Sequence, residues 1–275
     1  MTRTATPAML TAPTLPQANR HGINALAAAQ LQVDIGPYPG MEEGDLIELF
    51  WNNCFADSRR ITACKVGTST RLRVPQSFVQ DGSARVHYHV MQVGYAPARS
   101  AVACVQVKTD CPGGQLAAPL NTENCDENQN LNRVSMPETI GRYGVNSSQV
   151  RRGIPLTIEP YWGMATGDAI TLRWGDVRMD LPIIQASGVG LPVQVWVPSA
   201  VIVEAGDDTR LEVTYCILDR VGNNSRWAPM RALNIAACSP QTPARGAGAA
   251  ATYQPRHPGS PCELGDRRSM HIPKS

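Results

Sequence analysis

PYWGMATGDAITLRW, from Pro160 to Trp174, decides the fold, because a near copy of it, PYPGMEEGDLIELFW, runs from Pro37 to Trp51. Nine of the fifteen positions are identical, and the offset between the copies is 123 residues. In the later copy the apolar residues Ile170, Leu172 and Trp174 alternate with polar ones. A period of two is typical of a strand with one buried face. The phrase therefore predicts a turn followed by a β-strand, built twice.

The repeat extends well beyond this phrase. Val74-Pro75 matches Val197-Pro198 at the same offset of 123, and ARVHYHVM (84–91) matches LEVTYCIL (211–218) at an offset of 127. The second copy therefore contains four extra residues between these two points. Internal repeats of this length indicate two copies of one folding unit.

Strand and turn signals recur every few residues within each copy. In the second copy we expect six strands and a seventh candidate. In the whole sequence only the segment 23–31, at the start of the first copy, has a helical pattern. The expected strands lie near 154–158, 168–174, 193–197, 200–203, 210–218 and 230–236, and the seventh lies within 177–184. This spacing predicts an all-β chain of two tandem antiparallel sandwiches.

We interpret the remaining segments as the regions that link and flank the two copies. We expect a flexible N-terminal arm at 1–22, repeat 1 at 23–110 and a polar, Asn-rich connector at 111–150. Repeat 2 is expected at 151–238, and the low-complexity tail at 239–275 is expected to be disordered.

A motif in the second copy resembles a known class of repeats. The arrangement GD-x-I-x-L-x-W, followed by V-x-Y-x-I-x-D-x-x-GN-x-S, is similar to bacterial immunoglobulin-like and fibronectin type III-like repeats. The resemblance covers about 31–110 and 154–238, although MQVGYAPARS in the first copy departs from it. It implies tandem immunoglobulin-like sandwiches, as in surface proteins, adhesins and some phage structural proteins, and favours an extracellular or cell-surface location. No secretory signal is visible in the sequence.

Net charge, the length of the apolar runs and the absence of known catalytic motifs argue against several function classes. The net charge is +2 and the pI about 8.1, so a nucleic-acid partner is not expected. No apolar run reaches the length of a membrane span, so no membrane insertion is expected. Nucleophile-elbow, P-loop and H-E-x-x-H motifs are absent from the sequence. We therefore expect no enzyme activity and no cofactor, and we keep catalysis as the last alternative.

The best candidates for a binding surface are three tryptophans that the first copy lacks. Trp162, Trp196 and Trp227 stand where the first copy has Pro39, Arg73 and, roughly, Ser100. Trp196 is out of phase with Val195 and Val197, so its ring is expected to be exposed. Trp51 and Trp174, in contrast, follow the apolar phase of their strands and are expected in the cores.

No metal site is expected. Asp45 and Asp168 each follow a glycine, and both a calcium loop and a turn fit this pattern. The neighbouring glutamates of the first copy are missing from the second, which favours the turn. His87 and His89 share one strand face, but no third ligand lies near them in the sequence, so they are interpreted as surface histidines.

The eight cysteines show no CxxC pair and no zinc-ligand spacing. A bridge between Cys54 and Cys64 and another between Cys111 and Cys125 are possibilities, and the alternative is that several of the cysteines are free, buried thiols. Cys216 is expected to point outward from its strand, so an inter-sheet disulfide is not expected.

These observations predict a non-catalytic structural or interaction protein that mediates adhesion or binding at a bacterial surface or in a phage particle. Its ligand would be a protein or a glycan. The alternative is a carbohydrate-binding module that uses the exposed aromatic rings of repeat 2. Since the residues shared by the copies are those of turns and cores, function is expected in the residues that the copies do not share.

Overall fold

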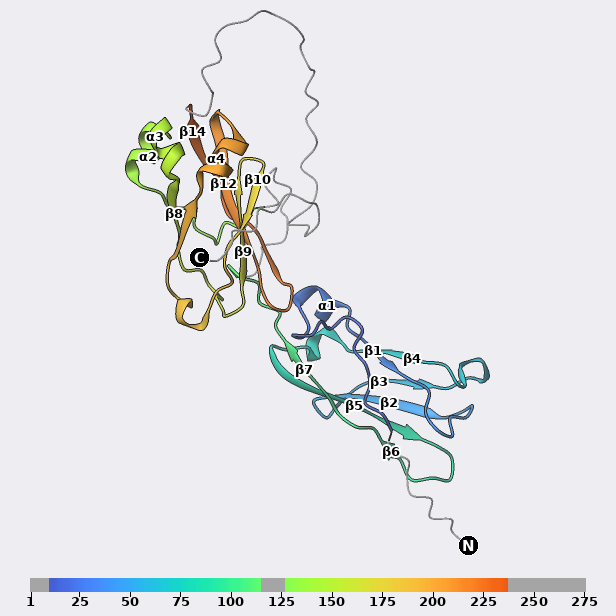
Figure 1. Ribbon diagram of the computed structural model, residues 1–275. Coiled ribbons are helices and arrows are strands. Elements are labelled where there is room, and N and C mark those ends of the chain that lie inside the picture. The colour runs from blue at the N-terminus through green and yellow to red at the C-terminus, as the bar shows by residue number, and fades with distance from the viewer. Residues whose placement is uncertain (1–9, 115–126, 237–275) are drawn as a thin grey trace, which may run out of the picture. The chain divides into compact units, whose positions relative to one another are not determined.

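The computed structural model describes residues 10–114 and 127–236 (Figure 1). The chain divides into two compact units. Unit 1 comprises Met1–Asp110 with Val221–Asn223, and unit 2 comprises Cys111–Arg220 with Asn224–Ser275. The two units are described separately below.

Unit 1 is a sandwich of a small and a large antiparallel sheet. The small sheet pairs β1 (Gln32–Ile35) with β4 (Thr70–Arg73). The large sheet has the order β3-β2-β5, and two short strands follow one another along the far side of β5. Its strands are β2 (Leu46–Trp51), β3 (Cys54–Arg60), β5 (Gly82–Met91), β6 (Ala98–Arg99) and β7 (Ala103–Val107).

Unit 2 repeats this topology strand for strand. Its small sheet pairs β8 (Ile154–Ile158) with β11 (Val193–Val197), and its large sheet has the order β10-β9-β12, with two strands beside β12. The large sheet contains β9 (Ala169–Trp174), β10 (Val177–Asp180), β12 (Asp208–Leu218), β13 (Asn224–Trp227) and β14 (Arg231–Ile235). The predicted fold class, two tandem antiparallel β-sandwiches, is confirmed.

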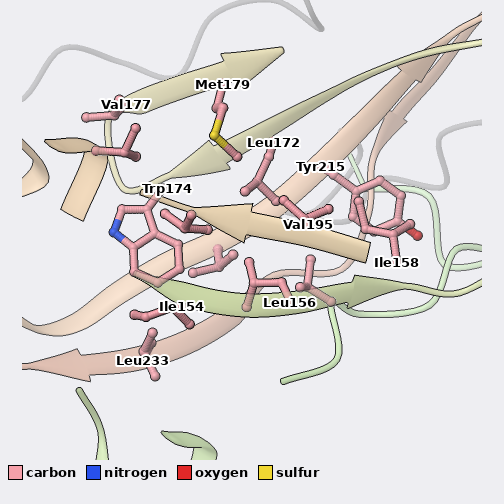
Figure 2. Close-up of a cluster of buried hydrophobic side chains, with 14 of the residues drawn as sticks. Ile154, Leu156, Ile158, Leu172, Trp174, Val177, Met179, Val195, Tyr215 and Leu233 are labelled. Carbon is pink, nitrogen blue, oxygen red and sulfur yellow. The ribbon is translucent and has the colours of Figure 1, made fainter. Parts of the chain in front are cut away.

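The core of each unit lies between its two sheets. In unit 2, Leu172 of β9 stands opposite Tyr215 of β12, and both are fully buried. Figure 2 shows these side chains and Trp174 facing Leu156 of the small sheet. In unit 1, Leu49 and Tyr88 form the equivalent pair. The alternation in the sequence thus marks the faces that the sheets bury against each other.

The repeated phrase builds one turn in both units. Asp168 Oδ2 accepts hydrogen bonds from the Tyr161 hydroxyl (2.9 Å) and the Ala165 backbone N–H (2.9 Å). Asp45 Oδ2 accepts the same two bonds from Tyr38 and Glu42. Gly44 and Gly167 precede the aspartates with φ of 94° and 93°, a left-handed conformation that favours glycine. The turn interpretation of these aspartates is confirmed.

Helices are short and more numerous than the sequence pattern indicated. The helical candidate at 23–31 contains α1 (Ala25–Ala29). The strand expected at 200–203 is wrong, because Ser199–Ala205 forms helix α4 between Pro198 and Gly206. The three-residue turn η2 (Gln76–Phe78) follows Pro75 at the same place in unit 1. The four extra residues of the second copy thus turn a single 3-10 turn into a helix.

Further short elements are α2 (Glu138–Tyr143), α3 (Ser147–Arg152), η1 (Ala63–Lys65) and η3 (Ala186–Gly188). Helix α2 and most of α3 lie in the stretch 111–150, which the sequence assigns to a connector. Buried residues from 131 to 150 belong to the unit 2 core. Leu10, from the segment assigned to a flexible arm, belongs to the unit 1 core. Both stretches therefore contribute to packing where the structure describes them, while the predicted tail lies outside the described residues.

Candidate functional site

Trp196 lies on the outward face of the small sheet of unit 2. Its neighbours Val195 and Val197 are buried, whereas 56% of Trp196 is exposed, as the alternation predicted. It pairs with Pro155 of β8. Gly153 lies beside the ring, and a Cβ at this position would collide with the indole Nε1. The indole therefore packs directly against the backbone of Gly153, where any side chain would displace it.

Trp162 lies in the turn between β8 and β9, and 59% of it is exposed. Its backbone carbonyl accepts a hydrogen bond from the Gly113 N–H at 2.8 Å. The neighbouring Gly114 also lies beside the ring, since a Cβ there would stand 3.7 Å from Cε3, an ordinary van der Waals contact. Segment 113–114 thus supports the turn that presents this indole.

Trp227 is half-buried on the outward face of the large sheet of unit 2. The guanidinium carbons of Arg173 and Arg178 lie 5.1 and 5.8 Å from the centre of its ring. Arg173 also bonds the Glu212 carboxylate at 3.1 Å. Cations over an indole face are attracted by its quadrupole. Trp227 is therefore held in a mixed aromatic and charged cluster.

The three tryptophans do not form one platform. Trp196 projects from the outward face of the small sheet, and Trp227 from the outward face of the large sheet. These faces are the two opposite sides of a sandwich. Any binding through these residues therefore involves separate surfaces.

The large sheet of unit 1 presents a different cluster on the equivalent face. Phe50 stacks on His87 at 5.1 Å between ring centres and lies 4.6 Å from His89 and 6.2 Å from Phe55. Only 3% of His87 is exposed, while 52% of Phe55 is exposed. Burial, followed by the nearby charge of Arg99, lowers the pKa of His87 below its usual value.

Strand register matches these two clusters position by position. Phe50 pairs with Phe55 and His87 in unit 1, and Arg173 pairs with Arg178 and Thr214 in unit 2. His89 pairs with Arg99, and Cys216 pairs with Trp227. The position in unit 1 that is equivalent to Trp227 is therefore occupied by Arg99. This corrects the approximate match with Ser100 that the sequence suggested. The sequence alone did not reveal these clusters, because they depend on cross-strand neighbours.

No metal centre is seen in the described part of the chain. Residues 10–114 and 127–236 contain no group of three or more His, Cys, Asp or Glu side chains that could hold an ion. His87 and His89 lie 5.3 Å apart between ring centres, and their nearest aromatic neighbour is Phe50. His87 is buried, contrary to its interpretation as a surface histidine.

The structure decides between the alternatives that the sequence left open for Cys54 and Cys64, and it places Cys216 in a disulfide. Cys54 and Cys64 are exposed free thiols, so the bridge considered between them is not formed. Cys54 begins β3, whereas Cys64 lies in η1, beyond the opposite end of this strand. Cys216, in contrast, is disulfide-bonded and only 6% exposed. It does lie on the outward strand face, but it is covered there.

None of the helices in the described ranges is long and apolar enough to cross a membrane. No protein-family model matches the sequence, and no curated protein matches it either.

Solved structures similar to this chain include bacterial immunoglobulin-like and fibronectin type III-like modules. A structure from a 1.5-MDa bacterial ice-binding adhesin matches 82% of this chain at 15% identity and a TM-score of 0.37, and the chain spans 65% of that structure. An immunoglobulin-like domain of the M. primoryensis ice-binding adhesin matches 37% of this chain and all of its own length, at 17% identity and a TM-score of 0.27. Fibronectin(III)-like modules of Clostridium thermocellum CbhA match 85% of this chain and 99% of theirs, at 10% identity and a TM-score of 0.40. The sandwich assignment itself rests on strand order and register.

Proposed function

We propose that this chain is a non-catalytic structural and interaction protein whose tandem sandwiches mediate adhesion or binding at a bacterial surface or in a phage particle. The observation that carries the proposal is the contrast between shared cores and unshared outward faces. Ile47, Leu49 and Trp51 recur as Ile170, Leu172 and Trp174 in the buried positions of β2 and β9. The outward positions of the same strands carry different chemistry.

The outward faces offer contacts of two kinds. Unit 1 presents an aromatic and imidazole cluster around Phe50, and unit 2 presents Arg173 and Arg178 against Trp227. Aromatic residues and arginines are enriched at protein interfaces, because they bury large area and make directional contacts. A scaffold that keeps its core while changing these faces is suited to two different contacts. The cellular location in this proposal rests on the sequence resemblance.

The test is binding of the full chain to immobilised bacterial polysaccharides and extracellular matrix proteins, measured by biolayer interferometry. We expect at least one surface to retain the chain. Phe55→Ser or Arg178→Ala should weaken that binding by about tenfold, the loss of about 1.4 kcal/mol. Leu26→Ala, at a site 77% exposed and on neither face, is the control and should have no effect. Absence of binding to every surface would overturn the interaction role.

Carbohydrate binding through unit 2 is the second candidate, and the exposure of Trp196 and Trp162 favours it. An exposed indole offers a flat apolar face with a polar N–H, which suits a sugar ring. A glycan array should then detect binding that Trp196→Ala abolishes. Leu191→Ala, at a site 56% exposed, is the matched control. A wild-type chain that binds no glycan, or a Trp196→Ala variant that binds as well as the wild type, would count against this candidate.

A further inference from the structure

The open edge of the unit 1 sandwich carries two hollows. This edge lies between β3, the last strand of the large sheet, and β4 of the small sheet. One hollow, of about 290 Å³, is lined by five charged residues, together with Ile61, Ser69 and Thr70. We call it the basic hollow, and its charged residues are Asp34, Arg59, Arg60, Lys65 and Arg71. The other hollow, of about 410 Å³, adjoins Arg73 to Gln76 farther along the same edge.

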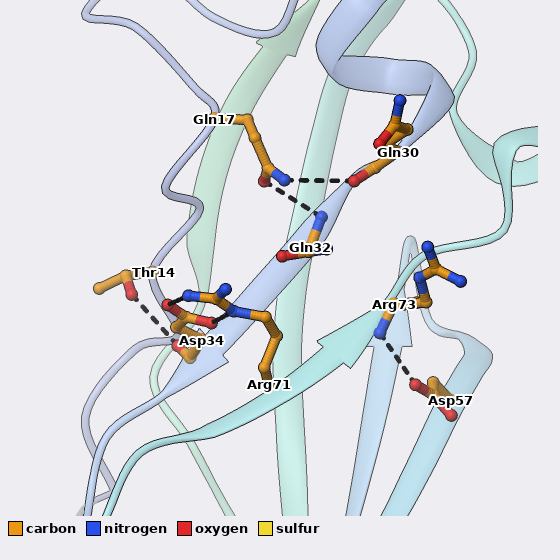
Figure 3. Close-up of polar contacts among 8 residues, drawn as sticks. All are labelled: Thr14, Gln17, Gln30, Gln32, Asp34, Asp57, Arg71 and Arg73. Atoms are coloured by element: carbon orange, nitrogen blue, oxygen red, sulfur yellow. Dashed lines mark hydrogen bonds and ion pairs between the residues drawn. The ribbon is translucent and has the colours of Figure 1, made fainter.

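The basic hollow has an excess of positive charge. Asp34 is its only carboxylate among the described lining residues, and Arg71 holds that carboxylate through two contacts of 2.6 and 2.8 Å (Figure 3). The bond with Arg71 lowers the pKa of Asp34, so this carboxylate stays ionised in its pair. Arg59, Arg60 and Lys65 are exposed and form no ion pair in residues 10–114 or 127–236. Arg60 donates one hydrogen bond to the Gly44 carbonyl at 3.2 Å. Arg59, Lys65 and the remaining N–H donors of Arg60 can therefore face a ligand.

The backbone of β4 is open beside these cations. The Val74 N–H donates to the carbonyl of Leu31, the residue just before β1. In an antiparallel pair the alternate residues Arg71 and Arg73 then turn their N–H and C=O groups away from β1. At Arg73 the N–H is bound by the Asp57 carboxylate at 2.8 Å (Figure 3). At Arg71 the outward groups face the side of the basic hollow.

The opposite edge of the small sheet is closed. Thr14 exchanges two backbone hydrogen bonds of 2.9 Å with Asp34. The Gln17 side chain accepts from the Gln32 N–H and donates to the Gln30 carbonyl (Figure 3). The outward backbone of β1 is therefore already paired, which leaves β4 as the edge that can accept another strand.

The fold does not require the basic residues. With the 123-residue offset, Arg59, Arg60 and Lys65 correspond to Pro182, Ile183 and Gly188 in unit 2. The pair of Asp34 and Arg71 is replaced by a 3.1 Å hydrogen bond between Thr157 and Gln194. The same sandwich edge is therefore built without these charges, and their presence in unit 1 needs another reason.

We propose that the basic hollow binds the carboxylates of an extended acidic peptide segment of a partner protein. The segment would add along β4, where its backbone meets the outward groups of Arg71 and its carboxylates meet Arg59, Arg60 and Lys65. The second hollow, lined by Leu31, Val74 and Pro75 among others, offers apolar contact for the next residues. From Thr70 to Gln76 the edge is about 20 Å long, room for about six extended residues.

A peptide fits this edge better than an anionic polysaccharide. A polysaccharide backbone has no regular row of amide N–H and C=O groups to pair with the open backbone of β4, whereas an extended peptide presents both donors and acceptors. No aromatic ring is among the described residues that line either hollow, so neither offers a stacking surface for a sugar.

This inference rests on the proposed interaction role and assigns a partner class to one surface of it. The test uses the full chain and a fluorescein-labelled peptide of about eight residues that alternates Glu and Val, read by fluorescence anisotropy. We expect saturable binding that weakens in about 0.5 M salt. The double variant Arg60→Ile with Lys65→Gly introduces the unit 2 residues, and we expect it to weaken binding by about tenfold.

Matched controls separate this site from general charge. Arg151→Ala with Arg152→Ala removes the same two charges from exposed positions of α3 and should leave peptide binding unchanged. A Lys–Val peptide should not bind. Equal losses in both double variants, or no binding of the acidic peptide, would overturn the proposal. Binding of polygalacturonate but not of the peptide would also overturn it. The interaction role is tested separately through Phe55, Arg178 and Trp196, so either result can fail alone.

Discussion

Tyr161 donates a hydrogen bond to the fully buried carboxylate of Asp168 at 2.9 Å, and Tyr38 makes the same 2.9 Å bond to Asp45 in the other unit. In each case burial, together with the adjacent carboxylate, raises the pKa of the tyrosine. Both hydroxyls therefore remain donors at any ordinary pH. The bond ties the turn between the two sheets to the start of a central strand.

Loss of this bond should destabilise unit 2 measurably. Tyr161→Phe leaves a buried carboxylate oxygen with one donor fewer, and we expect a loss of about 1.5–3 kcal/mol in the free energy of unfolding. Urea unfolding followed by far-UV circular dichroism measures it. Tyr143→Phe, at a residue 77% exposed, is the control and should change stability by less than about 0.5 kcal/mol. Equal stability of the two variants would show that the bond contributes nothing.

Truncation in the core should cost more than loss of one hydrogen bond. Leu172 is fully buried opposite Tyr215, so Leu172→Ala removes packed methyl groups and leaves a cavity. We expect a loss of about 2–5 kcal/mol, and a similar loss for Leu49→Ala in unit 1. Leu191→Ala, at an exposed leucine, provides the comparison. Chemical unfolding monitored by tryptophan fluorescence checks the prediction, and a loss below about 1 kcal/mol would contradict it.

Acid should weaken unit 1 through His87. Since the pKa of His87 is lowered in the folded state, the unfolded chain binds its proton more readily. The contribution of His87 to stability is therefore complete above pH about 6.5 and is lost as the pH falls below that value. The charged and titratable groups around it are Arg85, His89 and Arg99.

His87→Thr introduces the residue of the equivalent position, Thr214, and removes this titration. We expect the midpoint of thermal unfolding to fall less between pH 7 and 5 than in the wild type, because one destabilising protonation is gone. The readout is the change of the unfolding midpoint with pH. The midpoint at a single pH is not suitable, because loss of the stacking on Phe50 also lowers stability at every pH. Scanning fluorimetry across this range measures it, and identical slopes would refute the prediction.

Thiol titration should detect the disulfide at Cys216. The sequence has eight cysteines, so denatured but unreduced chain should show at least two thiols fewer than eight. Reduction should restore the full number and lower stability by about 2–5 kcal/mol. Alkylation in the native state should label Cys54 and Cys64, which are exposed. A count of eight thiols without reductant would contradict the disulfide.

The sequence pattern predicted the sandwich well because its period reports a local property. Each of Ile170, Leu172 and Trp174 lies on the face that its alternation indicates, and the constant offset aligned β2 with β9. The exposure of Trp196 followed from the same reasoning. These features depend on single strands, for which periodicity is the dominant signal.

Features that depend on distant contacts were not predictable in this way. Val201 and Ile202 are β-branched and resembled a strand, but Pro198 and Gly206 delimit a helix that buries them. The clusters around Phe50 and Trp227 bring together residues from separate strands, and the basic hollow joins β3, β4 and the segment between them. A single sequence does not show which residues of different strands pair with each other. The neighbours across strands could therefore not be predicted from it.

The unshared outward faces also bear on how the chain avoids misfolding. Tandem domains with similar core strands risk exchanging them during folding, and β2 and β9 share their buried residues. If β2 took the place of β9, Phe50 would stand where Arg173 contacts Glu212 and Trp227, and Glu48 would replace Thr171, which bonds Asp180. The exchanged arrangement would lose all of these contacts. Divergence of the surface thus helps each strand find its own partner, in addition to any ligand that it recognises.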